Sequence, residues 1–169
     1  MAAPGGFTWW TLDETRRTRQ LADGPRDLVN EYPEGRAAAR TQLLNFVSAL
    51  QSHLSTSSLV MGGFSQGGML ACDTVLSGAL KTDALLLLSS SRIAIDEWTL
   101  RAPVLNGMPI LIAHGHHDAD LAFSAGEALR DFHHTSGAQV TWHPFNGAHE
   151  IPLSVWRTVR KFLQHLYSR

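Results

Sequence analysis

The segment "MGGFSQGGML", residues 61–70, raises the central question about this chain. Ser65 stands between glycines, directly after a short apolar run and before a stretch with helical spacing. Residues 63–67 match the pattern G-x-S-x-G, in which a serine is held on a sharp turn between a strand and a helix. Glycines two residues away on either side avoid clashes in such a turn. The pattern therefore predicts that Ser65 is a nucleophile, the alternative being a small residue in a tight turn.

The elements around this segment predict an α/β fold, a mostly parallel sheet flanked by helices, in a single domain over residues 1–169. Unbroken apolar runs such as "ALLLL" are typical of parallel strands that are covered on both faces. Residues 1–34 are rich in glycine and proline and are expected to be irregular, and residues 92–108 are expected to form a loop with at most one helical turn. The expected strands are 57–63, 83–91, 108–115 and 138–145, and the expected helices are 36–54, 66–78, 122–134 and 152 onward.

Composition limits the classes of function. The net charge is −1, with 17% charged and 44% apolar residues, and no basic run or acidic tail suggests a nucleic-acid partner. The single cysteine, Cys72, is expected to be a buried, inert thiol in a reducing compartment. No secretory signal or membrane-length apolar run is present, so we expect a cytoplasmic protein without membrane insertion.

A nucleophilic serine needs a base, and the base needs a carboxylate that orients it. In strand–turn–helix hydrolases these groups follow the serine in the order acid, then histidine. Asp118 follows the apolar run of residues 108–115 by a few residues, and Asp120 is the competing choice for the acid. His149 lies in a glycine-containing loop before the last helix and is the expected base, whereas His143 lies inside a strand pattern.

Three motifs together resemble the phospholipase/carboxylesterase group of α/β-hydrolases, which includes the acyl-protein thioesterases. They are GFSQGG at 63–68, HGxxD at 114–118 and Gly-x-His at 147–149, and "AAPGGFTWW" at 2–10 is similar to a further family segment. The resemblance implies Ser65 as the nucleophile, Asp118 as the orienting acid and His149 as the base. It implies an oxyanion contact from the Gln66 N–H and a carboxylic ester or thioester as the substrate, without metal or organic cofactor. Substrate contacts are expected from Trp9, which matches a family aromatic near the pocket, and from Phe64 and Leu121.

The sequence departs from the family pattern in two places. After HGxxD the family usually has proline and then Val-Pro, whereas this chain has Ala119-Asp120-Leu121-Ala122. The family's L-H-G-x-G loop, which carries a second oxyanion donor, and the strands around it have no counterpart here. We therefore expect a shortened sheet in which residues 57–63 form an exposed edge, which a homodimer could cover. Without long insertions to form a lid, the expected substrates are small, short-acyl esters.

Two other functions compete with the serine hydrolase. A non-catalytic or inactive module of the same fold would explain the absence of the oxyanion loop. A metallohydrolase is suggested by "HGHHDAD", in which His114, His116 and Asp118 fit a metal-binding run but Ala119 replaces its last histidine. The same segment is already explained as a strand, a loop and the acid, so no metal site is predicted.

Overall fold

The structure, a computed structural model, describes residues 7–168. Along the chain the elements are α1 (Glu14–Ala22), α2 (Arg36–His53), β1 (Val60–Phe64), α3 (Gln66–Leu76), β2 (Ala84–Leu88), α4 (Ile95–Arg101), the 3-10 helix η1 (Ala102–Leu105), β3 (Pro109–Gly115), α5 (Phe123–Thr135), β4 (Gln139–Phe145) and α6 (Leu153–Tyr167).

Within the described residues the strands form one four-stranded sheet in the order β1-β2-β3-β4, and every neighbouring pair is parallel. The predicted α/β fold with a mostly parallel sheet is therefore confirmed. Because all strands run the same way, their carboxyl ends meet at one edge of the sheet, where sites of this architecture form. β1 is an outer strand, as predicted, and β4 is the other.

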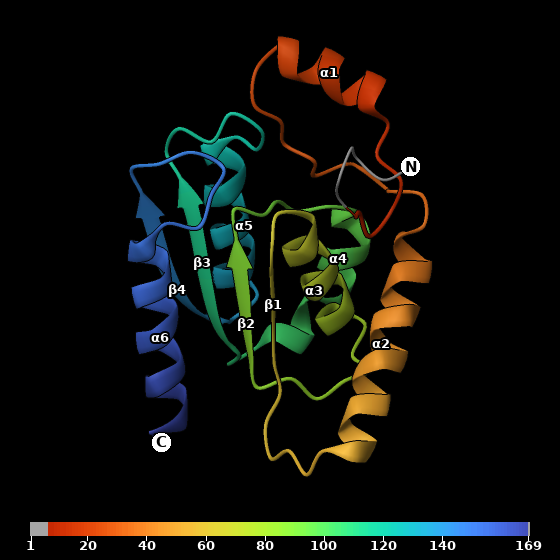
Figure 1. The fold of residues 1–169 in the computed structure, drawn as a ribbon, viewed down its shortest axis with the longest axis vertical. Helices are drawn as coiled ribbons and strands as arrows, with labels where there is room; N and C mark the ends of the chain where they lie inside the picture. The colour runs from red at the N-terminus through yellow and green to blue at the C-terminus, as the bar shows by residue number, and fades with distance from the viewer. Residues whose placement is uncertain (1–6, 169) are drawn as a thin grey trace.

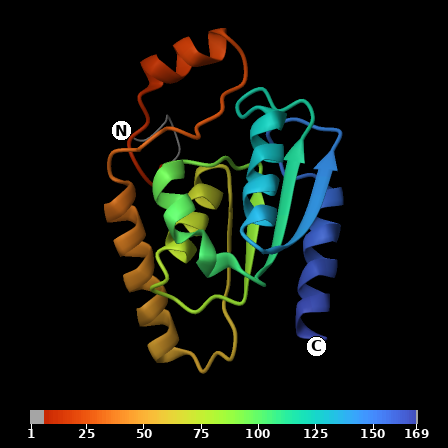
Figure 2. The same cartoon turned by 180° about the vertical axis from the view of Figure 1, so that it is seen from behind.

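Helices cover both faces of the sheet (Figures 1 and 2). α6 packs on one face over β3 and β4, while α3 and α5 pack on the other face, with α2 and α4 against α3. A core between the sheet and α3 contains Leu85, Leu87, Ile110 and Ile112, and a smaller core beneath α6 contains Leu111. The apolar runs of β2 and β3 are thus buried on both faces, which is why they lack the alternation of a half-exposed strand.

Two segments differ from the prediction. Residues 1–34 were expected to be irregular, but α1 forms there with an Asp13 N-cap and no buried residue. It lies above the carboxyl ends of the strands (Figure 1). Residues 92–108 were expected to be mostly loop, but α4 and η1 form there and bury Trp98 completely. Both helices are short and lack a long apolar repeat, so the sequence pattern did not reveal them.

The apolar face predicted for α2 is only partly buried. Val47 is buried, but Phe46 is 63% exposed, and Leu50 and Leu54 are also exposed. No helix among residues 7–168 is long and apolar enough to cross a membrane.

Candidate active site

Ser65 occupies the turn between β1 and α3 in a strained backbone conformation. Its φ is 52° and its ψ is −121°, a combination that residues with a Cβ rarely adopt. Its N–H donates to the Leu88 carbonyl at the end of β2, at 2.8 Å, and its carbonyl accepts from the Gly68 and Met69 N–H groups and the Ser90 hydroxyl. Bonds to the neighbouring strand and to the following helix therefore hold the strained residue in place.

The glycines around Ser65 are required by the closeness of the backbone. A Cβ on Gly63 would lie 2.3 Å from the carbonyl carbon of Gly67, and a Cβ on Gly68 would lie 2.8 Å from the Ser90 hydroxyl. Real side chains do not come this close to other heavy atoms. Gly63 and Gly68 are thus packing requirements of the turn, whereas a Cβ on Gly67, the last position of G-x-S-x-G, would make an ordinary contact of 3.6 Å with the Trp9 indole nitrogen.

Gln66, the first residue of α3, connects the turn to the N-terminal segment. Its side-chain carbonyl accepts the Trp9 N–H at 2.7 Å, and its amide nitrogen donates to the Trp10 carbonyl at 3.4 Å. Within residues 7–168 nothing accepts the Gln66 backbone N–H, as expected for the first turn of a helix. This N–H remains able to donate to a bound ligand.

Asp118 and His149 form the second part of the site. The Nδ1 of His149 lies 2.7 Å from the Oδ2 of Asp118, while the Oδ1 of Asp118 accepts the N–H groups of Asp120 and Leu121 at 2.9 and 2.8 Å. Burial by itself would raise the pKa of the Asp118 carboxyl. The hydrogen bonds from His149 and from the two N–H groups outweigh burial and hold that pKa below its usual value. Asp118 is therefore an ionised carboxylate that fixes the His149 ring.

Backbone bonds join the two loops that carry this pair. The His116 N–H donates to the Phe145 carbonyl, and the His117 N–H donates to the Gly147 carbonyl, each at 2.9 Å. Gly115 permits the close approach, since a Cβ there would lie 2.4 Å from the Gly147 carbonyl oxygen. The loop after β3 and the loop after β4 are thus one packed unit.

The two parts of the site meet at Phe64. Its ring lies 4.6 Å from the His149 imidazole, measured between centroids, and Phe64 directly precedes Ser65. Among the described residues the Ser65 hydroxyl makes no hydrogen bond, and catalytic hydrogen bonds in ligand-free enzymes are often long. The structure therefore gathers Ser65, Asp118 and His149 around the carboxyl ends of β1, β3 and β4.

Asp120, the competing choice for the acid, lies on the other side of the imidazole. Its Oδ2 is 3.9 Å from the Nε2 of His149, and its carboxylate pairs with Arg26 and Arg17. His143 lies within β4 and approaches the Thr158 hydroxyl at 3.3 Å. Sequence reasoning did not anticipate Arg17 or Arg26 at this place, because both are far from Asp120 in the sequence, with Arg26 94 residues before it and Arg17 earlier still.

The predicted substrate contacts have different surroundings. Trp9 is 51% exposed and lines a groove together with Phe64 and Ser65. Leu121 is 1% exposed and packs in the core, so its side chain has no face toward a substrate. The expectation for Leu121 was wrong because the side chain fills the interior, while the backbone N–H reaches Asp118.

The groove beside Ser65 follows the outer edge of β1, and none of the lining residues that the structure describes, 7–168, is charged. Its lining comprises Phe7, Trp9, Leu43, Phe46, Val47, Leu59, Val60, Met61, Gly62, Gly63, Phe64, Ser65, Gln66, Gly67, Leu70 and Ala71. An apolar group attached to a carbonyl at Ser65 would find apolar walls here.

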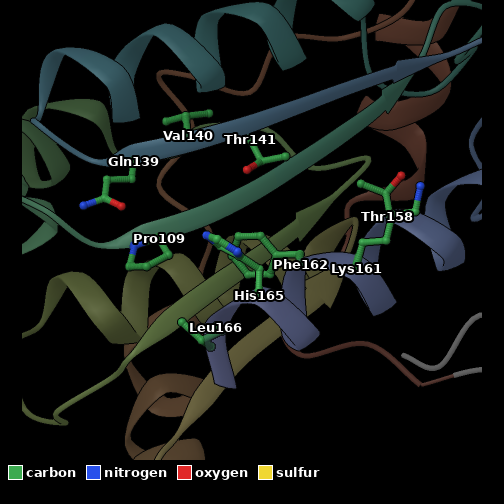
Figure 3. A pocket seen from close by; sticks show the side chains of 9 residues that line it. All are labelled: Pro109, Gln139, Val140, Thr141, Thr158, Lys161, Phe162, His165 and Leu166. Carbon is green, nitrogen blue, oxygen red and sulfur yellow. The ribbon is translucent and has the colours of Figure 1, made fainter. Parts of the chain in front are cut away.

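Another cavity lies between β4 and α6, at the opposite end of the sheet (Figure 3). It encloses about 490 Å³ and includes Pro109 and Gln139, the first residues of β3 and β4. Ser65, Asp118 and His149 all follow the last residues of strands, so this cavity is separate from them.

The histidines of the suggested metal run have other partners. His114 is fully buried, with its Nε2 3.1 Å from the Leu121 carbonyl, and burial lowers its pKa. The His116 ring stacks on Phe123 at 4.1 Å. Within residues 7–168 no three His, Cys, Asp or Glu side chains are arranged to hold a metal ion. Cys72 is buried as predicted, and burial raises the pKa of its thiol.

A parallel sheet with a strained serine between strand and helix defines an α/β-hydrolase. A model of the phospholipase/carboxylesterase family matches residues 29–167, and the chain belongs to that family. A search of the curated proteins gave no match.

Solved structures with the same fold include hydrolases. SOBER1 of Arabidopsis thaliana is 19% identical with a TM-score of 0.77, and the alignment covers 96% of this chain and 77% of that one. Esterase PE8 is 24% identical with a TM-score of 0.77, covering 96% and 72%. Acyl-protein thioesterase 2 of Zea mays is 20% identical with a TM-score of 0.68, covering 96% and 74%. Family and fold together indicate a hydrolase of the carboxylesterase or thioesterase type.

Proposed function

We propose that this chain hydrolyses short-acyl carboxylic esters or thioesters through Ser65, His149 and Asp118. The observation that carries the proposal is the strained Ser65 turn, with the Asp118–His149 pair held against the adjacent Phe64 ring. A strained serine beside an oriented imidazole is the arrangement that acyl transfer needs.

Each residue would have one role. Ser65 attacks the carbonyl carbon while the Nε2 of His149 accepts its proton, and the Gln66 N–H donates to the oxyanion. His149 then protonates the leaving alcohol or thiol, which leaves an acyl group on Ser65. A water that gives its proton to His149 attacks this acyl group, the bond to Ser65 breaks to release the acid, and His149 returns the proton to the Ser65 oxygen. Asp118 holds the imidazole with its proton on Nδ1 and stabilises the imidazolium. No metal or organic cofactor is needed for these steps.

Substrate size remains a prediction from the sequence. The uncharged groove beside Ser65 supports an acyl group without charge, with Trp9 and Phe64 as contacts. We expect p-nitrophenyl acetate and butyrate to give higher kcat/KM than the laurate and palmitate esters. A steady rise of kcat/KM toward the long chains would contradict the short-acyl proposal and leave the reaction class intact.

The first test is labelling of the purified chain with a fluorophosphonate probe, which reacts with a serine that a working base activates. We expect labelling of the wild type, none of Ser65→Ala, and strongly reduced labelling of His149→Ala. Ser52→Ala, at an exposed serine of α2, is the matched control and should label like the wild type. A folded wild-type protein that does not label would support the alternative, a non-catalytic module of this fold.

Partner and location stay predictions as well. We propose that a second copy of the chain covers the outer strand β1, since a short apolar edge with exposed neighbours on α2 favours pairing. Light scattering during size-exclusion chromatography distinguishes a dimer from a monomer of 18.6 kDa. A cytoplasmic location is expected from the sequence alone.

A further inference from the structure

The segment around Arg26 is attached to the loop that carries Asp118. Arg26 and Leu121 form a parallel bridge in which the Arg26 N–H donates to the Asp120 carbonyl at 3.0 Å. The Arg26 carbonyl accepts the Ala122 N–H at 2.9 Å. The N–H groups of Asp120 and Leu121 point the other way and donate to Asp118. Arg26 therefore fixes the strand-like backbone that presents two hydrogen-bond donors to the acid.

The Arg26 side chain acts on the same loop through charge. Its guanidinium donates to the Oδ1 of Asp120, and Arg17 of α1 lies 3.3 Å from the Oδ2. The side chains of Arg26 and Asp120 are only 12% and 19% exposed, so water screens this pair weakly. Arg17 and Arg26 therefore share the carboxylate of Asp120.

The imidazole of His149 stands between two carboxylates. Asp118 binds Nδ1 at 2.7 Å, and Asp120 lies 3.9 Å from Nε2, the nitrogen that must accept the serine proton. Other groups near the ring are Phe64, which is uncharged, His114, whose Nε2 is 3.4 Å from Asp118, and Glu150, which accepts the Ala148 N–H. Without a counter-charge, Asp120 would stabilise a proton on Nε2 and keep the base charged.

We propose that Arg26 is a positioning residue that neutralises Asp120, so that the Nε2 of His149 stays free to act as a base at neutral pH. Arg17 supports it from α1. The proposal rests on the proposed function, since it gives His149 the role of base. It assigns a role to Asp120, at the place where this sequence departs from the family pattern.

Two variants are expected to shift the His149 titration in opposite directions, and two more are expected to leave it close to the wild type. Arg26→Met leaves Asp120 with Arg17 alone, so the pH at which the His149 ring takes up a proton should rise. Asp120→Asn leaves Arg26 without its carboxylate, so that pH should fall. Arg26→Met/Asp120→Asn removes both charges and should return close to the wild type. Arg26→Lys keeps the positive charge and should also remain close to the wild type.

Two measurements on the full chain test this pattern. NMR titration of the histidine rings, with His149 assigned by comparison with His149→Gln, follows the protonation directly and needs no turnover. The acid limb of kcat/KM for p-nitrophenyl acetate reports the same group if it is the base. Arg16→Met is the matched control, because Arg16 lies next to Arg17 on α1 but pairs with Glu31. This variant should leave the titration of His149 unchanged.

The outcomes separate the two proposals. A His149 titration that stays in place in folded Arg26→Met, or that does not return in the double variant, overturns the role of Arg26. A titration that follows the expected signs, in a protein that neither turns over ester nor labels with fluorophosphonate, supports the role of Arg26 and contradicts the proposed function. If Arg26→Met unfolds, Asp120→Asn still gives the sign of the effect, and a His149 titration that does not fall in that variant overturns the proposal.

Discussion

The two halves of the candidate site are held by different means. The serine half, β1 and the start of α3, relies on close backbone packing, with a positive φ at Ser65 and no space for a side chain at Gly63. The acid–base half, the loops after β3 and β4, relies on hydrogen bonds. Asp118 accepts from His149 and from the N–H groups of Asp120 and Leu121, and the N–H groups of His116 and His117 donate to the loop after β4. One half lies on an outer strand, and the other lies on the loops of β3 and β4.

This difference has a chemical reason. A serine hydroxyl must be exposed to attack a carbonyl, so its position has to come from the backbone beneath it. A buried carboxylate must instead be compensated, because an ionised group without partners is costly in the interior. We therefore expect the serine half to be sensitive to added volume, and the acid–base half to be sensitive to lost charge. The predictions below test this difference, beginning with the largest effect on turnover.

Asp118→Asn should lower kcat by ~10³–10⁴-fold, because an amide cannot hold the proton on the Nδ1 of His149. The side chain keeps its shape, so its oxygen can still accept the N–H groups of Asp120 and Leu121. The melting temperature should change little in comparison. Kinetics with p-nitrophenyl acetate together with thermal unfolding measure both. A loss of less than tenfold would exclude Asp118 as the orienting acid.

Gly63→Ala should act through volume. The new methyl group would lie within 2.6 Å of three backbone atoms of Gly67 and Gly68, so the turn must move. We expect ~10²-fold lower turnover and destabilisation of about 1–3 kcal/mol or more. Gly24→Ala is the control, since a Cβ there meets no atom within 4 Å, although its φ of 125° adds backbone strain. If the two variants lose turnover equally, backbone packing at Ser65 is not what positions the hydroxyl.

Asp73→Asn should lower stability while active molecules keep their rate. Asp73 of α3 is fully buried and accepts from Arg36 and Arg40 of α2 and from the Trp98 indole, at 2.9–3.0 Å. Removing one partner of a buried ion pair typically costs about 3–5 kcal/mol. Urea unfolding gives the free energy, and fluorophosphonate titration counts the active molecules. A turnover per active molecule that falls more than tenfold would show that this network also shapes the serine turn.

The sequence predicted those parts of the fold that repeat a simple pattern. The spacing of residues 36–54 has the period of a helix, and the short unbroken run "ALLLL" is typical of a strand covered on both faces. Both elements form within a few residues of the expected bounds. α1 has no apolar stripe from which it could be predicted, since it buries no residue. Ion pairs such as Arg16–Glu31 connect it to the rest of the chain. α4 is too short for a repeat, and one buried side chain, Trp98, anchors it.

The candidate site was predictable where one motif contains its own geometry. G-x-S-x-G places the strained residue and the glycines within five residues, and the strand pattern before it and the helical pattern after it are what make Ser65 a candidate nucleophile. The choice between Asp118 and Asp120 is different, because both follow β3 and both approach the His149 ring. Only the tertiary structure shows which nitrogen each carboxylate faces. Arg26 was not predictable, because its partner Asp120 lies 94 residues away.

A contact in the core, outside both halves, gives the smallest effect on turnover and a distinct dependence on pH. Cys72 of α3 and His133 of α5 meet in the core, with the sulfur 3.5 Å from Nε2 and the Nδ1 bound to the Leu129 carbonyl. Burial lowers the pKa of His133 from 6.5 to about 4, so the folded chain keeps this ring neutral. Between these two pH values the unfolded chain binds a proton that the folded chain does not, and stability falls as the pH falls.

We expect this one ring to lower the free energy of unfolding by about 2 kcal/mol between pH 7 and pH 5, with turnover at pH 7 unaffected. Urea unfolding at both pH values measures this loss of stability. The carboxyl of Asp118 does not titrate in this range, because its pKa is held below the usual value of 3.8. His133→Leu should remove the part of this loss that His133 causes, while the buried His114, whose pKa is also lowered by burial, contributes a loss of the same sign. The exposed neighbour variant His134→Gln should keep the full loss. If His133→Leu keeps the full loss at pH 5, the acid sensitivity arises elsewhere.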